Sequence, residues 1–299
     1  ASIHVHLPAP SLSVRVWNGS PHEFLIKAAE LTRTGIGLPA YYNDEVIIPA
    51  LQNRGLSLAD AREYNIIGCV EPQKAGKTEG WHDAAFFNMC RPLELVFSQG
   101  MDKGEMVGVP TKDISEMHSF EDFYDAYKQQ MDYCISLMVN ADNAIDVAHG
   151  ERCPLPFLSS MIDDCIKKGK STQEGGAVYN FTGPQGFGIA NMADSLYAIR
   201  KLVFEEKQFT LGELKEALIW NYGKGLDQQS VQDLAQGILK EAENAGRQVD
   251  EKMTEAVVQS VLSMKLSKEK ISRYEEIRNK ILEVPKFGND IPEVDYFAR

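Results

Sequence analysis

Strand-like and helix-like segments alternate over the first 70 residues, and this alternation limits the possible folds more than any other feature. Residues 11–16 alternate polar and apolar side chains, which predicts a β-strand. Residues 20–34 open with a Ser-Pro-x-Glu helix-start signal and end just before a glycine, which predicts a helix. The short apolar run at 65–68 predicts a second, buried strand. Strand, helix and strand in this order favour the α/β fold class.

The segments that follow are predicted to be helices separated by one long loop. Asn43 can cap a short helix that ends near Gly55, and a second short helix is predicted over 57–64. The stretch 69–82 contains Pro and Gly and follows neither periodicity, so it predicts a loop. Asp83 can cap the next helix. That helix is predicted to reach position 100 and to bend at its internal proline, with further helices over 119–149 and 154–168.

The second half of the chain is predicted to be mainly helical. Thr210 and Glu213 have the spacing of a capping box, which marks a helix start. Residues 227–282 are rich in Lys, Glu and Gln on a sparse apolar stripe, which predicts a surface helical excursion. No change in composition is sharp enough to mark a domain boundary.

Composition and charge exclude several classes of protein. The net charge of −12 argues against a nucleic-acid or anionic-membrane surface. No apolar run reaches membrane-spanning length, and the first residues do not form a signal peptide. The five cysteines are odd in number and form no Cys-x-x-Cys pair, which argues against a disulfide framework or a structural zinc site. These features predict a cytoplasmic protein whose thiols are reduced. The chain begins without Met, so we expect it to be processed or cut from something longer.

The stretch from Ile67 to Gln73 is the most informative motif, because Cys69 and Glu71 lie two positions apart within it. On an extended backbone, residues at this spacing project to the same side. Gly68 permits close backbone approach, and Pro72 stiffens the exit. A thiol and a carboxylate could then face one substrate together, and a buried Cys beside an exposed Glu would fit the spacing equally well.

The sequence around this motif resembles the glycyl radical enzymes of the pyruvate formate-lyase type. Gly68-Cys69-Val70-Glu71-Pro72 is similar to their active-site Cys-x-Glu loop. The resemblance continues through three further segments, which are residues 76–88, 179–185 and 285–290. Within the family it is nearest to the cobalamin-independent glycerol and propanediol dehydratases. It implies part of a ten-stranded α/β barrel of the glycyl radical enzyme type, with a mainly helical second half. Residues 1–299 would be the central part of one catalytic domain, incomplete at both ends.

The resemblance implies radical chemistry. A backbone glycyl radical, installed by a separate S-adenosylmethionine enzyme with a 4Fe-4S cluster, oxidises the active-site thiol to a thiyl radical. The thiyl then takes a hydrogen atom from a substrate C–H bond, and a neighbouring group leaves. Carried over by position, Cys69 is the thiyl and Glu71 the base that deprotonates the substrate hydroxyl. Asp83 is a substrate-hydroxyl ligand, with a helix cap as its structural alternative, and His82 is assigned to the substrate site as a residue that packs or orients a neighbour.

Differences from the family pattern narrow the reaction. Val70 follows the thiol where pyruvate formate-lyase has a second cysteine, so acyl transfer is disfavoured. His82-Asp83 stands where choline-cleaving members have Thr-Ser, so choline is disfavoured as well. The chain has no match to the family's radical-glycine motif. We therefore expect the radical Gly to lie outside the chain and the 299 residues alone to be inactive.

Three functional hypotheses remain at this point. The first is a fragment of a radical dehydratase acting on a vicinal diol such as glycerol or 1,2-propanediol. The second is a radical C–S lyase acting on a small sulfonate such as isethionate, although no arginine in the chain is an obvious clamp for the sulfonate. The third is a non-catalytic orphan fragment. The expected partners are a small-molecule substrate, a radical S-adenosylmethionine activating enzyme and a second copy in a homodimer, with no nucleic acid and no membrane. No metal is expected, because the acidic residues and histidine of 142–151 have the spacing of a polar helix face.

Overall fold

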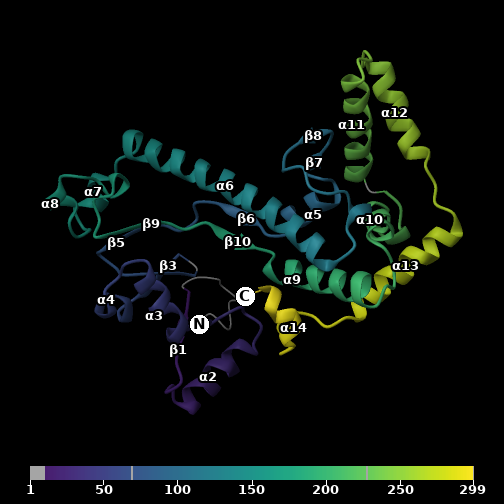
Figure 1. Ribbon diagram of the computed structural model, residues 1–299. Coiled ribbons are helices and arrows are strands. Elements are labelled where there is room, and N and C mark those ends of the chain that lie inside the picture. Colours follow the sequence, from purple (N-terminus) through teal and green to yellow (C-terminus); the bar gives the residue numbers. More distant parts are fainter. Residues whose placement is uncertain (1–10, 69, 227, 299) are drawn as a thin grey trace. The chain divides into compact units, whose positions relative to one another are not determined.

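The computed structural model describes residues 11–68, 70–226 and 228–298 (Figure 1). The chain divides into two compact units, each made from two stretches of sequence. Unit 1 comprises Ala1–Ala85 and Ala141–Gln185, and unit 2 comprises Phe86–Asn140 and Gly186–Arg299. None of the helices described has an apolar stretch long enough to cross a membrane.

Unit 1 begins with a strand, a helix and a parallel strand. The strands β1 (Ser13–Val16) and β2 (Ala40–Asn43) pair in parallel, and α2 (His22–Thr32) lies between them in the sequence. Two parallel strands cannot be joined by a tight turn, so the connection has to cross over, and this helix forms it. The observed order confirms the strand–helix–strand prediction for this part of the chain.

Two further strand pairs of unit 1 carry the predicted site. The strands β3 (Asn65–Ile67) and β4 (Glu71–Gln73) form an antiparallel hairpin. The strand β5 (Thr78–Trp81) pairs in parallel with β9 (Tyr179–Thr182), which lies about a hundred residues later in the chain. Helices α3 (Asp44–Asn53) and α4 (Leu58–Arg62) cover a small core that Tyr179 and Phe181 of β9 also contact.

The remaining elements of unit 1 follow the long helix α6 (Phe120–Arg152), whose last turns belong to this unit. They are two short helices, α7 (Pro156–Ser159) and α8 (Cys165–Lys168), and one turn of 3-10 helix, η2 (Thr172–Glu174).

Unit 2 is built around one large apolar cluster. Its most buried side chains include Phe123 of α6, Leu196 of α9 (Ile189–Ala198) and Ile277 of α13 (Lys268–Glu283). The unit also contains the following elements: β6 (Phe86–Asn88), α5 (Arg91–Phe97), β7 (Met101–Asp102), β8 (Glu105–Met106), η1 (Ile114–Glu116), β10 (Gln185–Phe187, whose first residue belongs to unit 1), the π-helix η3 (Ile199–Glu205), α10 (Leu211–Ile219), η4 (Asn221–Gly223), α14 (Pro292–Asp295) and η5 (Tyr296–Ala298).

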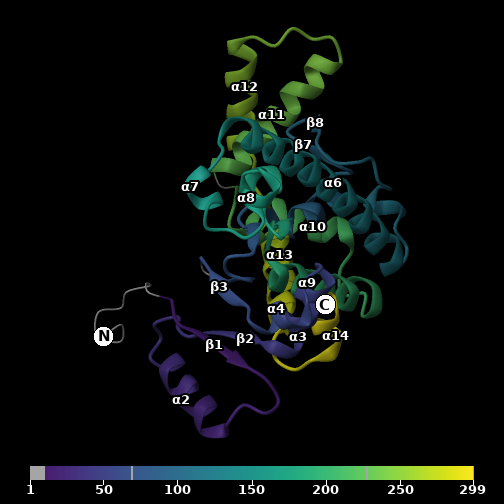
Figure 2. The same ribbon diagram turned by 90° about the vertical axis from the view of Figure 1, so that its left-hand side faces the viewer.

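Two helices of unit 2 pack mainly against each other. Helices α11 (Gln228–Asn244) and α12 (Glu251–Ser263) lie side by side in both views and share a small cluster around Val231 and Val261 (Figure 2). The helix that follows them, α13, instead contributes Tyr274 and Ile277 to the large cluster. The surface helical excursion over 227–282 stays a prediction.

Several helix predictions are confirmed by the caps that were used to make them. The Asn43 side chain accepts the Glu45 backbone N–H at the start of α3. At the start of α10, Thr210 and Glu213 form both hydrogen bonds of the predicted capping box. From Ile189 to residue 298 every described element is helical, as predicted for the second half.

Other local predictions are wrong. The loop expected over 69–82 contains β4 and β5, because the partners that stabilise these strands lie outside the stretch itself. The helix expected from Asp83 to Gly100 is a turn, the strand β6 and then the short α5, which has Pro92 in its first turn. Proline is compatible with a helix start, since its missing N–H would have no partner there.

Three more differences concern helix ends and burial. The helix expected over 154–168 is split into α7 and α8, and Asp164 between them adopts a left-handed conformation with φ of 73°. The strand β3, expected to be buried, has only Ile66 partly covered. Ser20 does not cap α2, because its hydroxyl accepts the Trp17 N–H instead.

Candidate functional site

Glu71 opens β4, the second strand of the β3–β4 hairpin. It pairs in register with Ile67, and only 7% of its surface is exposed. Gly68 has a φ of +60°, and a Cβ at this position would lie 2.7 Å from Glu71 Oε2. A side chain here would therefore be strained and would also collide with the carboxylate. This is the close approach that the glycine of the Gly-Cys-Val-Glu motif was predicted to allow.

Hydrogen bonds hold both oxygens of the Glu71 carboxylate. Oε2 accepts the backbone N–H of Val70 at 2.8 Å. Oε1 accepts the side-chain amide of Gln185 at 3.1 Å. Hydrogen bonds to an ionised carboxylate stabilise the charged form, so this buried acid is held in a fixed orientation as an acceptor.

Gln185 links the two carboxylates that were assigned to the site. Its Nε2 donates to Glu71 Oε1 and also to Asp83 Oδ1. An amide NH₂ group has two hydrogens that diverge from one nitrogen, so one donor can serve two separate acceptors. Sequence reasoning did not assign a role to Gln185, and the only signal for it was its place in the family-like segment 179–185.

Asp83 lies in a turn after β5, and its side chain is exposed. It caps no helix, because the next helix begins only at Arg91. The Gln185 backbone N–H donates to the Ala85 carbonyl at 2.8 Å, which anchors the amide beside this turn. The structure thus brings Glu71 and Asp83 together through a third side chain and removes the cap as an explanation for Asp83.

His82 lies next to Asp83 in the sequence but packs against an aromatic ring. Its imidazole meets Phe181 edge-on, with ring centroids 5.3 Å apart. It also lines a cavity of about 210 Å³ together with Pro72 and Arg54. Burial lowers the pKa of His82, and the nearby charges of Glu71 and Asp83 only partly oppose this. A neutral, packed imidazole fits the expectation that this residue packs or orients a neighbour.

The position of Cys69 lies outside the described residues. In the sequence it lies between the end of β3 at Ile67 and the start of β4 at Glu71. Of the four cysteines that the structure describes, Cys165 is buried and Cys153 is exposed. The exposed Cys153 is therefore not a packing residue.

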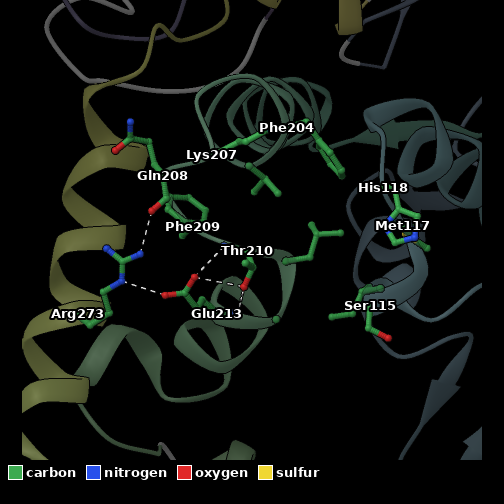
Figure 3. A pocket seen from close by; sticks show the side chains of 14 residues that line it. Ser115, Met117, His118, Phe204, Lys207, Gln208, Phe209, Thr210, Glu213 and Arg273 are labelled. Carbon is green, nitrogen blue, oxygen red and sulfur yellow. Dashed lines mark hydrogen bonds and ion pairs between the residues drawn. The ribbon is translucent and has the colours of Figure 1, made fainter.

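A large cavity of unit 2 contains none of the predicted site residues. It has a volume of about 700 Å³ (Figure 3). Its lining combines apolar side chains such as Phe204 and Phe209 with polar side chains such as Thr210. The guanidinium of Arg273 at its edge donates to Glu213, Glu276 and the Gln208 carbonyl. This arginine therefore ties α13 to α10 and to the preceding loop, and its donors already have protein partners.

The acidic face of α6 forms no metal centre in the described part of the chain. No group of three or more His, Cys, Asp or Glu side chains is arranged there, or elsewhere among the described residues, to hold a metal ion. His149 instead packs edge-on against Trp81, with centroids 4.9 Å apart. Burial, with a smaller effect from Asp146, raises the pKa of Glu79 on the same strand as Trp81.

Comparison with known proteins gives the family. The family model described as pyruvate formate lyase-like matches residues 1–299. The chain belongs to this family. Among solved structures, that of 1,2-propanediol dehydration in Roseburia inulinivorans is 62% identical with a TM-score of 0.92 and covers 100% of this chain and 36% of that one. The glycerol-bound B12-independent glycerol dehydratase from Clostridium butyricum is 51% identical with a TM-score of 0.73, over 100% of this chain and 32% of that one.

The curated relatives are also longer than this chain. The (2S)-3-sulfopropanediol dehydratase of Klebsiella oxytoca is 38% identical over 223 residues, which are 74% of this chain and 27% of that protein. The chain thus spans about a third of the length of the proteins it matches. The matched structures include a glycyl radical enzyme from Archaeoglobus fulgidus, and they confirm the prediction of a mixed α/β fragment of the glycyl radical enzyme barrel.

Proposed function

We propose that the protein containing this chain is a glycyl radical lyase that dehydrates a small vicinal diol such as glycerol or 1,2-propanediol. The observation that carries the proposal is that the Gln185 amide holds together two carboxylates, Glu71 of the Cys-x-Glu motif and Asp83. Two ionised carboxylates side by side accept hydrogen bonds and donate none. They are complementary to a ligand that presents two neighbouring hydroxyl groups.

The proposed reaction assigns each residue one step. The thiyl form of Cys69 takes a hydrogen atom from a substrate carbon that bears a hydroxyl, which leaves a thiol and a carbon radical. Glu71 accepts the proton of that hydroxyl. The hydroxyl on the neighbouring carbon, bound at Asp83, then leaves as water with the proton that Glu71 accepted, which returns Glu71 to its carboxylate form. The carbonyl-containing radical takes the hydrogen atom back from Cys69, so the net products are an aldehyde and water.

The chemistry that this chain does not supply is the radical itself. A glycyl radical, installed by a radical S-adenosylmethionine activating enzyme, would supply the unpaired electron when present. Glycyl radical proteins among the relatives support this part of the proposal. His82 is proposed to support the site by packing against Phe181, with no proton transfer of its own.

A substrate panel tests the proposal. The full-length enzyme, activated anaerobically, would be given glycerol, 1,2-propanediol and isethionate in separate reactions. We expect aldehyde from at least one diol and no sulfite from isethionate. Isethionate is the matched alternative because an isethionate sulfite-lyase from Nitratidesulfovibrio vulgaris is 31% identical to this chain. Release of sulfite without turnover of any diol would contradict the proposal.

A further inference from the structure

The neutral side chain of Gln185 contacts both proposed substrate-binding carboxylates. Each carboxylate accepts from the same nitrogen, Nε2. The carbonyl oxygen of the amide cannot take this place, since an acceptor facing two carboxylates would be repelled. The chemistry of its neighbours therefore fixes the orientation of the amide.

The backbone also fixes the place of this amide. Gln185 begins β10, and its N–H donates to the Ala85 carbonyl two residues beyond Asp83. The side chain leaves this anchor and reaches Glu71 on β4, 114 positions away in the sequence. Three separate segments of unit 1 thus meet at one NH₂ group, and removing that group leaves two carboxylates with no shared donor.

We infer that Gln185 is a positioning residue that sets the separation of Glu71 and Asp83 and keeps both carboxylates ionised. The inference rests on the proposed function, because it takes the two carboxylates as acceptors for adjacent hydroxyls. Two neighbouring negative charges repel, and the site would relieve the repulsion by taking up a proton. The two N–H dipoles of the amide stabilise both charges without neutralising either of them. Gln185 therefore acts through Glu71 and Asp83 and not on the substrate.

The test compares Gln185→Met with the wild type in the activated full-length enzyme. Methionine keeps an unbranched side chain of similar length and removes both donors. We expect kcat/KM for the diol to fall about 10²-fold, the size of effect that misplaced reacting groups produce. We also expect the acid limb of the pH profile of kcat/KM to move to higher pH, because one carboxylate protonates more easily once the donor is gone. His82 also interacts electrostatically with both carboxylates, and burial lowers its pKa below the ordinary value.

Gln185→Glu gives an independent readout because it has the same shape. At high pH it adds a third carboxylate, and at lower pH its protonated form restores one donor. Its activity relative to the wild type should therefore rise as the pH falls. The same two substitutions at Gln52, an exposed residue of α3, are the matched controls and should leave both the rate and the profile unchanged.

Each outcome decides between the hypotheses. Glycyl radical content, measured by electron paramagnetic resonance, shows whether each variant is folded and activated. If the Gln185→Met enzyme holds the radical but the acid limb of its kcat/KM profile stays at the wild-type pH, the inference is wrong, whatever the turnover rate of the variant. If that variant cannot hold the radical, Gln185→Glu decides alone, and a pH-independent activity ratio overturns the inference. Failure of the wild type to turn over any diol would instead contradict the proposed function.

Discussion

Arg273 in unit 2 and Gln185 in unit 1 each join two carboxylates, and the two arrangements differ in charge. In unit 2, the Arg273 guanidinium donates to Glu213 at 3.0 Å and to Glu276 at 2.8 Å. In unit 1, the neutral amide of Gln185 donates to Glu71 and to Asp83. The guanidinium cancels one of the two negative charges, whereas the amide cancels none.

The positive charge of Arg273 affects the pKa values of the two glutamates that it joins. Burial raises the pKa of Glu213, but the Thr210 N–H and the Arg273 guanidinium outweigh it and hold the pKa below its ordinary value. Hydrogen bonds from Arg273 and Lys280 likewise lower the pKa of Glu276. Such a trio stabilises the fold. The amide-bridged pair instead holds two carboxyl groups together through a neutral donor.

The largest expected effect concerns the thiol two positions before Glu71. Cys69→Ser in the full-length enzyme should abolish diol turnover, because an O–H bond is too strong to exchange a hydrogen atom with a C–H bond. The glycyl radical should still form and be visible by electron paramagnetic resonance. The matched control is Cys153→Ser at an exposed cysteine, which should keep wild-type activity. Appreciable product from Cys69→Ser would refute the assignment of the thiyl.

The next effect breaks the amide-bridged pair at its buried member. Glu71→Gln keeps the shape but removes the base, so kcat should fall by about 10²–10⁴-fold, the usual contribution of general acid–base catalysis. Steady-state kinetics of the activated enzyme measure this. Glu116→Gln, at an exposed position of unit 2, is the control and should change nothing. A Glu71→Gln variant with wild-type kcat would show that this carboxylate takes no proton.

A smaller effect is expected at the exposed member of the pair. Asp83→Asn should lower kcat/KM by about 10- to 100-fold, the value of hydrogen bonds to a charged acceptor. We expect most of the change in KM, because Asp83 binds a hydroxyl and removes no proton from the radical carbon. Asp132→Asn, an exposed aspartate, is the control. A fall in kcat alone, with KM unchanged, would contradict the role of a substrate ligand.

The smallest effect is expected from a substitution that makes the Arg273–Glu213–Glu276 trio of unit 2 resemble the amide-bridged pair of unit 1. Arg273→Gln replaces the guanidinium by a neutral amide and should lower the melting temperature at neutral pH, because Glu213 and Glu276 lose their cation. Both glutamates have lowered pKa values in the fold, so the stability they contribute is present above pH 4.5 and is lost as the pH falls through their lowered pKa values.

The difference in melting temperature between wild type and Arg273→Gln should therefore close on acidification below pH 4.5. Arg247→Gln, at an exposed arginine, is the control for the substitution itself. A difference that is independent of pH would mean that Arg273 acts through packing and not through charge.

Sequence reasoning succeeded where a structure depends on neighbouring residues. The Asn43 cap and the Thr210–Glu213 capping box involve side chains within three residues of the groups they bind, and both are present. It failed for β5, since this strand pairs with a strand about a hundred residues later. A stretch whose partner is so distant shows no periodicity of its own when it is only three or four residues long.

The candidate site shows the same division. Gly68 and Glu71 lie in one short motif, and the close approach that the glycine allows was anticipated from it, whereas the burial of the Glu71 carboxylate was not. Gln185 was not anticipated, because its contact with Glu71 spans 114 positions and no local rule connects them. Asp83 was left between a cap and a ligand until the structure placed it in a turn with no helix to cap.

The most direct test of this account is a structure of the full-length enzyme with a vicinal diol bound. We predict that its two hydroxyl oxygens lie within about 2.5–3.0 Å of the Glu71 and Asp83 carboxylates, one at each, with Gln185 Nε2 still donating to both acids. A diol bound away from either carboxylate, or a Gln185 amide turned away from the pair, would contradict the account.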